Sequence, residues 1–268
     1  MNPSIMEHNL RAAALWGSGG RAYDRISRSI SGGIEHCVDR LNPSTGERIA
    51  DVATGTGWAS REIARLGAQV VGVDIAGPLL EAAREIALEQ NLAIDYRLGD
   101  AEALPFSDGE FDGVISTFGV MFVPDQQRAA SELARICRSG GRLAIAAWLP
   151  ESNAVKMRQV LQPYAPAPPV APPSPFVWGT PDWLTATLGR DFSLGFEEGV
   201  VLARFSSSAA AWGAWTEGFG PVRAVAEALD EAMRNELRTA FLSWTDQFRT
   251  GLGISIPFPY LVAIGRRT

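Results

Sequence analysis

The chain has 268 residues, of which 46% are hydrophobic and 20% charged, and its formal net charge at pH 7 is −6. This length and this apolar content suffice for one elaborated globular domain with a sizeable core. An acidic chain offers no general positive field to a phosphate backbone, so we do not expect a nucleic acid as its main partner.

Metal-binding and membrane-spanning classes are also disfavoured. The two cysteines, Cys37 and Cys137, lie far apart, and His8 and His36 are the two histidines, so we expect neither a zinc site nor a disulfide framework. The longest apolar run, residues 143–149, is far shorter than the roughly 20 residues that span a bilayer. Residues 1–20 lack the pattern of a signal peptide. We therefore expect a cytoplasmic protein without membrane insertion.

Short apolar runs alternate with helical patterns between residues 48 and 148. We predict strands at 48–53, 69–73, 94–98, 112–116 and 142–148. Helical periodicity over 59–66, 79–89 and 129–136 separates several of them. Strands joined by helices require crossover connections, which predicts a parallel sheet that is covered on both faces.

The pattern changes after Pro150. Prolines recur at every third position over residues 163–175, which predicts an extended polyproline II connection. A strand at 200–205, a helix at 209–219, one helical pattern through 222–248 and a last strand at 259–265 follow. A helical block between two late strands predicts a cap over the carboxyl edge of the sheet.

The loop Asp51-Val-Ala-Thr-Gly-Thr-Gly57 lies between a predicted strand and a predicted helix. Gly55 and Gly57 permit positive φ and a close approach of a ligand to the main chain, while the helix start favours an anionic group. A dinucleotide loop would have the pattern G-x-G-x-x-G, and Ser60 stands at its third glycine. This departure weakens a nicotinamide-cofactor interpretation without excluding it.

Asp74 ends the second predicted strand. An acid at this position accepts hydrogen bonds from both hydroxyls of a ribose, which indicates an adenosine-containing cofactor but not which one. The alternative is a structural N-cap of the helix that begins near Pro78.

Five motifs in this order make the similarity specific: DVATGTG (51–57), GVDI (72–75), GDAEALPF (99–106), FDGVIS (111–116) and RSGGRL (138–143). Together they resemble the class I S-adenosylmethionine-dependent methyltransferases, in the group related to the ubiquinone/menaquinone-biosynthesis C-methyltransferases. STFGVMFVPD (116–125) and AWLPES (147–152) are similar to a small-molecule subgroup. The resemblance is strong over residues 45–150 and weaker elsewhere.

The resemblance implies a set of contacts to S-adenosylmethionine. The methionine part would be cradled by Asp51, Thr54, Gly55 and Gly57. The Ser116 carbonyl would contact its amine, and Tyr23 would close over its carboxylate. At the other end Asp74 would hold the ribose hydroxyls and Ile75 would pack on the adenine. Asp100 would accept from the adenine amino group, and the Ala101 N–H would reach a ring nitrogen.

The implied fold is α/β: a Rossmann-like, doubly wound, mostly parallel seven-stranded sheet with a helical cap near the C-terminus. One domain would comprise N-terminal lid helices (1–44), a cofactor-binding core (45–150), a substrate-side cap and insertion (151–258) and a closing strand (259–268).

Methyl transfer from a sulfonium needs alignment and exclusion of water, and it needs a general base only where the acceptor carries a proton. His36 is the leading candidate base, although a structural role is the alternative. Weaker candidates are Tyr164, Tyr260, Glu217 and Asp246. An apolar or aromatic acceptor pocket has as candidates Phe118, Met121, Trp148, Trp178, Trp212 and Trp215, which equally suit a plain core.

The segment STFG (116–119) stands where enzymes that methylate nucleobase amines carry [DN]PP[YF]. We therefore expect a small-molecule acceptor, methylated at O, N or C, and no nucleic acid. The alternatives are an NAD(P)-dependent oxidoreductase and a non-catalytic regulator that binds S-adenosylmethionine.

Overall fold

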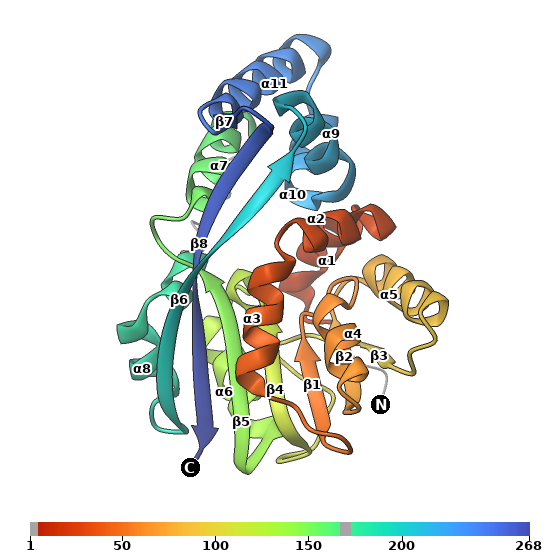
Figure 1. Cartoon of the computed structure of the whole chain (residues 1–268), viewed down its shortest axis with the longest axis vertical. Coiled ribbons are helices and arrows are strands. Elements are labelled where there is room, and N and C mark those ends of the chain that lie inside the picture. The colour runs from red at the N-terminus through yellow and green to blue at the C-terminus, as the bar shows by residue number, and fades with distance from the viewer. Residues whose placement is uncertain (1–4, 167–172) are drawn as a thin grey trace.

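The computed structural model describes residues 5–166 and 173–268 (Figure 1). One sheet has the strand order β3-β2-β1-β4-β5-β8-β6, with the short β7 beside β8. The strands are β1 (Arg48–Val52), β2 (Gln69–Asp74), β3 (Asp95–Leu98), β4 (Phe111–Thr117), β5 (Cys137–Trp148), β6 (Phe192–Phe205), β7 (Arg249–Thr250) and β8 (Gly253–Arg267). β1 to β5 pair in parallel, and β8 runs antiparallel to both β5 and β6. The predicted Rossmann-like sheet is confirmed, with β7 as an eighth strand.

Helices cover the sheet because each presents an apolar stripe to it. They are α3 (Ser31–Leu41), α4 (Trp58–Arg65), α5 (Gly77–Glu89), α6 (Gln126–Ile136) and α8 (Pro181–Leu188). Ile34, Val38 and Leu41 of α3 are buried at spacings of four and three, as expected for a helix with one apolar face. Figure 1 shows α3 in front of the sheet and α6 behind it.

The N-terminal helices lie at the end toward which the parallel strands point (Figure 1). They are η1 (Glu7–Asn9), α1 (Leu10–Gly17), η2 (Gly20–Ala22) and α2 (Tyr23–Ser29). A buried Arg61 holds α2 in place: it donates to Asp24 Oδ1 at 2.8 Å and to the Thr56 carbonyl at 2.6 Å. α2 is thus tied to the loop that follows β1; α1 and α2 are called the lid helices below.

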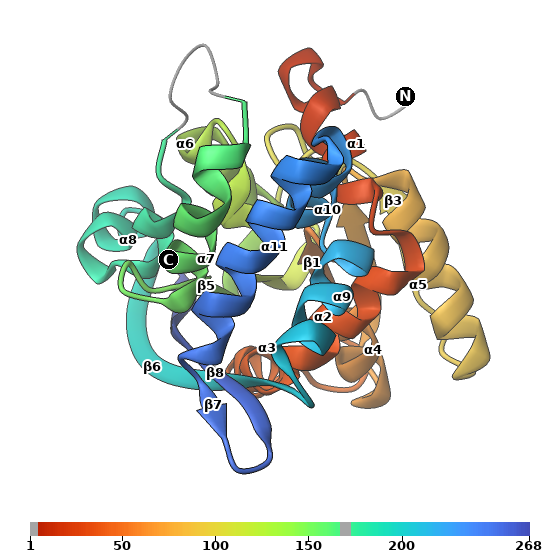
Figure 2. The same ribbon diagram turned by 90° about the horizontal axis from the view of Figure 1, so that it is seen from above.

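The cap lies between β6 and β8 in the sequence, as predicted. It consists of α9 (Ser208–Gly218), α10 (Gly220–Ala228) and α11 (Glu231–Asp246), and α7 (Asn153–Leu161) packs against α11 (Figures 1 and 2). Its core is aromatic, with Trp215 against Phe241 and Trp244 at centroid distances of 5.1 and 5.8 Å.

Two predictions about the C-terminal half are wrong in detail. The helix predicted through 222–248 breaks after Ala228, because the Asp230 side chain accepts the Met233 N–H at 2.8 Å and so starts α11 as its N-cap. The strands predicted at 200–205 and 259–265 are much longer: β6 and β8 pair from Phe192↔Arg267 to Phe205↔Ile254. Most of the first half of β6 is not buried, so it lacks the apolar run that marks a strand in the sequence.

Six of the thirteen residues of the predicted polyproline segment, 163–175, are residues 167–172 and lie outside the described residues. Its described ends belong to 3₁₀ turns, η4 (Gln162–Tyr164) and η5 (Pro175–Gly179). Across residues 5–166 and 173–268, the helices are all too short or too polar to cross a bilayer.

Replacing Gly57 with alanine should destabilise the fold. Gly57 has φ +79°, and a Cβ there would lie 2.1 Å from Tyr96 Oη. Left-handed strain and overpacking together should cost about 3 kcal/mol of unfolding free energy, measured by urea denaturation. The matched control is Gly213→Ala, on the exposed middle of α9 with no atom within 4 Å of the new Cβ, where we expect a gain of about 0.5–1 kcal/mol. Equal effects of the two substitutions would contradict this reading of the loop.

Candidate cofactor and acceptor site

The loop between β1 and α4 turns sharply at left-handed residues. Ala53, Gly55 and Gly57 have φ of +58°, +58° and +79°. The Thr54 N–H donates to the Val73 carbonyl at 3.0 Å, which fixes the loop beside the end of β2. The absence of a Cβ at Gly55 permits a ligand to approach the main chain closely.

Asp74, at the end of β2, is the electrostatic centre of the site. Its Oδ2 accepts the Gly55 N–H and its Oδ1 accepts the Ala76 N–H, both at 2.8 Å. No cation pairs with it among the described residues, and burial raises the pKa of this carboxyl to about 6. Each oxygen keeps a free lone pair, so the carboxylate can still accept two hydroxyl donors.

Asp51, at the end of β1, is buried as deeply. Its Oδ2 accepts the hydroxyls of Thr54 and Ser60, each at 2.6 Å, while Oδ1 is buried with no partner among the described residues. Burial raises the pKa of this carboxyl as well. A carboxylate oxygen left open in this way suits an ammonium donor, directly or through a water.

A cavity of about 710 Å³, its open mouth included, lies against these elements; we call it the loop cavity. Of the ten residues predicted to bind the cofactor, six line it: Tyr23, Gly55, Asp74, Ile75, Asp100 and Ala101. The other four, Asp51, Thr54, Gly57 and Ser116, lie behind the lining and hold it in place.

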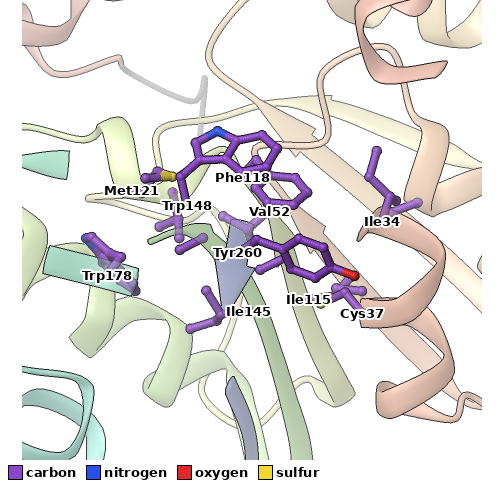
Figure 3. Close-up of a cluster of buried hydrophobic side chains, with 14 of the residues drawn as sticks. Ile34, Cys37, Val52, Ile115, Phe118, Met121, Ile145, Trp148, Trp178 and Tyr260 are labelled. Atoms are coloured by element: carbon purple, nitrogen blue, oxygen red, sulfur yellow. The ribbon is translucent and has the colours of Figure 1, made fainter. Parts of the chain in front are cut away.

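Ser116 shows how this supporting layer works. Its hydroxyl donates to the Val52 carbonyl at 2.7 Å and accepts the Val120 N–H at 3.2 Å, so it joins the end of β1 to η3 (Val120–Phe122). Phe118, between them, has φ +59° and stacks on Trp148 at 3.9 Å between centroids, as Figure 3 shows. The loop after β4 thereby forms one wall of the loop cavity.

The lid helices form the opposite wall. The Tyr23 ring lies directly over Gly55, where an added Cβ would meet it at 3.3 Å. Burial, with the nearby Asp74 charge, raises the pKa of the Tyr23 hydroxyl. The Trp16 ring of α1 packs edge to face against the Tyr23 ring, with 6.3 Å between the ring centroids.

Sequence reasoning missed two lining residues on this wall, Asn9 and Ala12. The Asn9 amide donates to Asp100 Oδ2 at 2.9 Å, and the Met6 N–H donates to the same oxygen at 3.0 Å. The one usable signal was spacing: Asn9, Ala12 and Trp16 recur at three and four residues, and so share one helical face.

A second cavity, the apolar cavity, adjoins the first and measures about 1040 Å³ with its open mouth. It shares with the loop cavity Ala12, Trp16, Phe122, Val123 and Pro124. Its remaining lining is formed by Leu15, Met121, Trp148, Ala154, Met157, Arg158, Leu161, Pro173, Pro175, Phe176, Phe219 and Pro221. Within this lining, Arg158 is the single ionisable side chain.

The predicted acceptor-side residues divide accordingly. Met121 and Trp148 line the apolar cavity and Phe118 the loop cavity, whereas Trp178, Trp212 and Trp215 line neither. Trp178 is fully buried, and the other two pack within the cap.

The candidate bases lie away from both cavities. His36 bonds through Nδ1 to Tyr260 Oη at 2.9 Å and through Nε2 to Glu197 at 3.0 Å, and neither His36 nor Tyr260 lines either cavity. Figure 3 shows the Tyr260 hydroxyl directed toward α3. Glu217 pairs with Arg25, Asp246 accepts from Ser208, and Tyr164 is also absent from both linings.

Three features define a Rossmann-like domain that binds an adenosine-containing cofactor: the strand order, the glycine loop after β1, and Asp74 at the end of β2. Residues 50–145 match the family model described as a methyltransferase domain. The chain belongs to the class I S-adenosylmethionine-dependent methyltransferases, and S-adenosylmethionine is the methyl donor of this family.

Curated relatives extend over different shares of the chain. An uncharacterized protein of Mycobacterium tuberculosis is 44% identical over 146 residues, 54% of this chain and 53% of its own length, so the chain spans about half of it. A second uncharacterized protein of that organism is 37% identical over 191 residues, 70% of each chain. The demethylmenaquinone methyltransferase of Thermus thermophilus is 38% identical over 130 residues, 46% of this chain and 59% of its own.

Solved structures show the same fold. The YcgJ protein of Bacillus subtilis superposes with a TM-score of 0.60 at 16% identity and covers 88% of this chain and 98% of its own. The phosphoethanolamine N-methyltransferase 2 of Haemonchus contortus, solved with S-adenosylhomocysteine, superposes with a TM-score of 0.54 at 18% identity. The match covers 87% of this chain and 52% of that protein.

The residues present fit S-adenosylmethionine. Asp74 retains two acceptor positions for a ribose diol, and Asp51 has an open buried oxygen near the loop where the methionine amine is expected. Gly55 provides a main chain with no Cβ at the point of closest approach, beneath Tyr23.

The affinity for S-adenosylhomocysteine should fall in acid. Ribose hydroxyls donate to the ionised Asp74, so binding lowers the pKa of this carboxyl below its unligated value of about 6 and releases a proton at lower pH. We expect a dissociation constant about tenfold higher at pH 5 than at pH 7.5, with a plateau above pH 7, measured by calorimetry. Asp74→Asn should bind weakly and lose this dependence. A pH profile that is the same in both proteins would show that another group titrates.

Proposed function

We propose that the chain transfers the methyl group of S-adenosylmethionine to a small, mainly apolar molecule held in the apolar cavity. The observation that carries this proposal is that the loop cavity and the apolar cavity share a wall of five residues, from α1 and from η3 with the loop after it. Two compounds bound in these cavities would be separated by these side chains alone, so methyl transfer would require the side chains of this wall to move aside.

The bound cofactor supplies an activated methyl group on a sulfonium, so the protein need not form a covalent intermediate. Asp74 would hold the ribose and the main chain at Gly55 the methionine end. Ile75 and Leu79 offer apolar surface to the adenine. The work left to the chain is alignment and exclusion of water, in which Trp16 and Tyr23 close the site.

The lining of the apolar cavity limits the acceptor chemistry. Its described side chains include no carboxylate, histidine, lysine, cysteine or tyrosine that would take a proton from the acceptor. A suitable acceptor atom therefore carries a free lone pair in water near neutral pH: an uncharged amine, a thiolate, or an acidic phenol or enol. Arg158, exposed and without an ion pair among the described residues, would favour the anionic members of this group.

The cofactor part of the proposal is tested by calorimetric titration with S-adenosylhomocysteine and with NADH. We expect saturable binding of the first alone, and a loss of affinity of about tenfold or more in Asp74→Ala, because both ribose hydrogen bonds to a charged acceptor disappear. Asp95→Ala, on the exposed start of β3, is the control and should bind as the unaltered protein does. Binding of NADH alone would establish the oxidoreductase alternative instead.

The acceptor part is tested by filling the apolar cavity. Ala154 lines that cavity and not the loop cavity, so Ala154→Phe should abolish methyl transfer to any acceptor found by mass spectrometry, yet keep the affinity for S-adenosylhomocysteine within about twofold. Ala209→Phe adds the same ring to an exposed position of α9 and should retain turnover. Unaltered turnover in Ala154→Phe would place the acceptor elsewhere, and cofactor binding without transfer to any compound would favour the regulator.

A further inference from the structure

Asn9 is a buried polar side chain whose hydrogen bonding is incomplete. Only 1% of the residue is exposed, yet its Oδ1 has no partner among the described residues. An acceptor left unpaired in the interior is costly, so a donor is expected from outside the described residues. Asn9 lines the loop cavity together with Gly99, Asp100 and Ala101, which makes a ligand in that cavity the available source.

The orientation of the Asn9 amide is determined by its neighbour. Its Nδ2 donates to Asp100 Oδ2 at 2.9 Å, and a carboxylate can only accept. The two ends of the amide are therefore not interchangeable, and the unpaired atom is the oxygen, an acceptor.

Asp100 has little acceptor capacity left for a ligand. Its Oδ2 takes both the Met6 N–H at 3.0 Å and the Asn9 amide, and its Oδ1 takes the Glu102 N–H at 2.9 Å. One lone pair remains on Asp100, against two on Asn9 Oδ1. The acceptor role that the family resemblance gives to Asp100 is thus better provided for, in this chain, by Asn9.

We propose that Asn9 Oδ1 accepts a hydrogen bond from the exocyclic amino group of the cofactor's adenine, and that it selects a 6-amino over a 6-oxo purine. Asp100 orients the amide for this contact. The inference rests on the proposed binding of S-adenosylmethionine and adds a base-specific contact from α1 to it. A 6-oxo purine would place an acceptor against an acceptor and leave both unpaired.

The test compares S-adenosylhomocysteine with its deaminated analogue, S-inosylhomocysteine, by calorimetry. The unaltered protein should prefer the adenine compound by about 10- to 100-fold, because a site built to accept a hydrogen bond rejects a ligand that lacks the donor. In Asn9→Leu, which keeps the size of the side chain and removes the acceptor, the preference should fall by about tenfold. Any preference left belongs to N1 of the purine, an acceptor in adenine and an N–H donor in the 6-oxo base, which the Ala101 N–H is expected to face.

Met6→Pro is the matched control. Met6 has φ −59° and ψ +136°, which proline adopts, so this substitution removes the other donor to Asp100 and leaves Asn9 intact. Met6→Pro should raise the dissociation constants of S-adenosylhomocysteine and S-inosylhomocysteine by the same factor, so the preference for the adenine compound should be unchanged.

Four outcomes overturn the inference. A preference that is undiminished in Asn9→Leu, or one that Met6→Pro abolishes equally, refutes the role of Asn9 and leaves the proposed function in place. A preference below about threefold in the unaltered protein does the same even if Asn9→Leu fails to fold. Failure of the unaltered protein to bind S-adenosylhomocysteine refutes the proposed function and this inference together.

Discussion

The site depends on a buried carboxylate, Asp74, that has no cationic partner among the described residues. Asp74 joins three segments, because its oxygens hold the Gly55 N–H of the loop after β1 and the Ala76 N–H before α5 while its own backbone ends β2. The raised pKa means that this arrangement costs folding stability in full above about pH 6. The cost shrinks as the pH falls from 6 toward the ordinary pKa of 3.8 and disappears below it, where the carboxyl is protonated in both the folded and the unfolded chain. A protein keeps such a cost where a ligand offsets it, and two ribose hydroxyls are donors of the required kind.

Contacts with the loop between β1 and α4 also position the lid helices. Arg61 on α4 binds Asp24 on α2 and the Thr56 carbonyl, and Tyr23, next to Asp24, consequently covers Gly55. On α1, Trp16 meets Tyr23 and continues into the wall of the apolar cavity. The loop cavity and the apolar cavity are therefore not independent pockets. A displacement of α1 would open the adenine end and reshape the acceptor end together, which is consistent with alignment being the main catalytic task of the chain.

The parts of the fold that the sequence predicted are those in which one local rule dominates. Buried parallel strands give continuous apolar runs, and Gly55 and Gly57 stand where a left-handed backbone favours glycine. Prediction failed where tertiary packing decides. Most of the first half of β6 is not buried, and one N-cap, Asp230, divides a helical pattern that is otherwise continuous. Asn9 was not identified, because its spacing to Ala12 and Trp16 indicates only a shared helical face, and its partner Asp100 lies 91 residues away in the sequence.

The contrast between local rules and tertiary packing also explains why sequence motifs predict the cofactor-binding residues but not the residues around the proposed acceptor. The loop cavity contains charges and main-chain groups that must each meet a partner at a fixed distance, so few residues can replace Asp74 or Gly55. The apolar cavity is enclosed by side chains such as Met157, Leu161 and Phe176, which other apolar residues of similar volume replace at little cost. The family match follows this division: it covers residues 50–145, whereas the apolar cavity takes only 121–124 from that range and the rest from segments on either side. A shape assembled from interchangeable residues leaves no motif, and the identity of the acceptor is therefore a property of the folded cavity and not of any stretch of sequence.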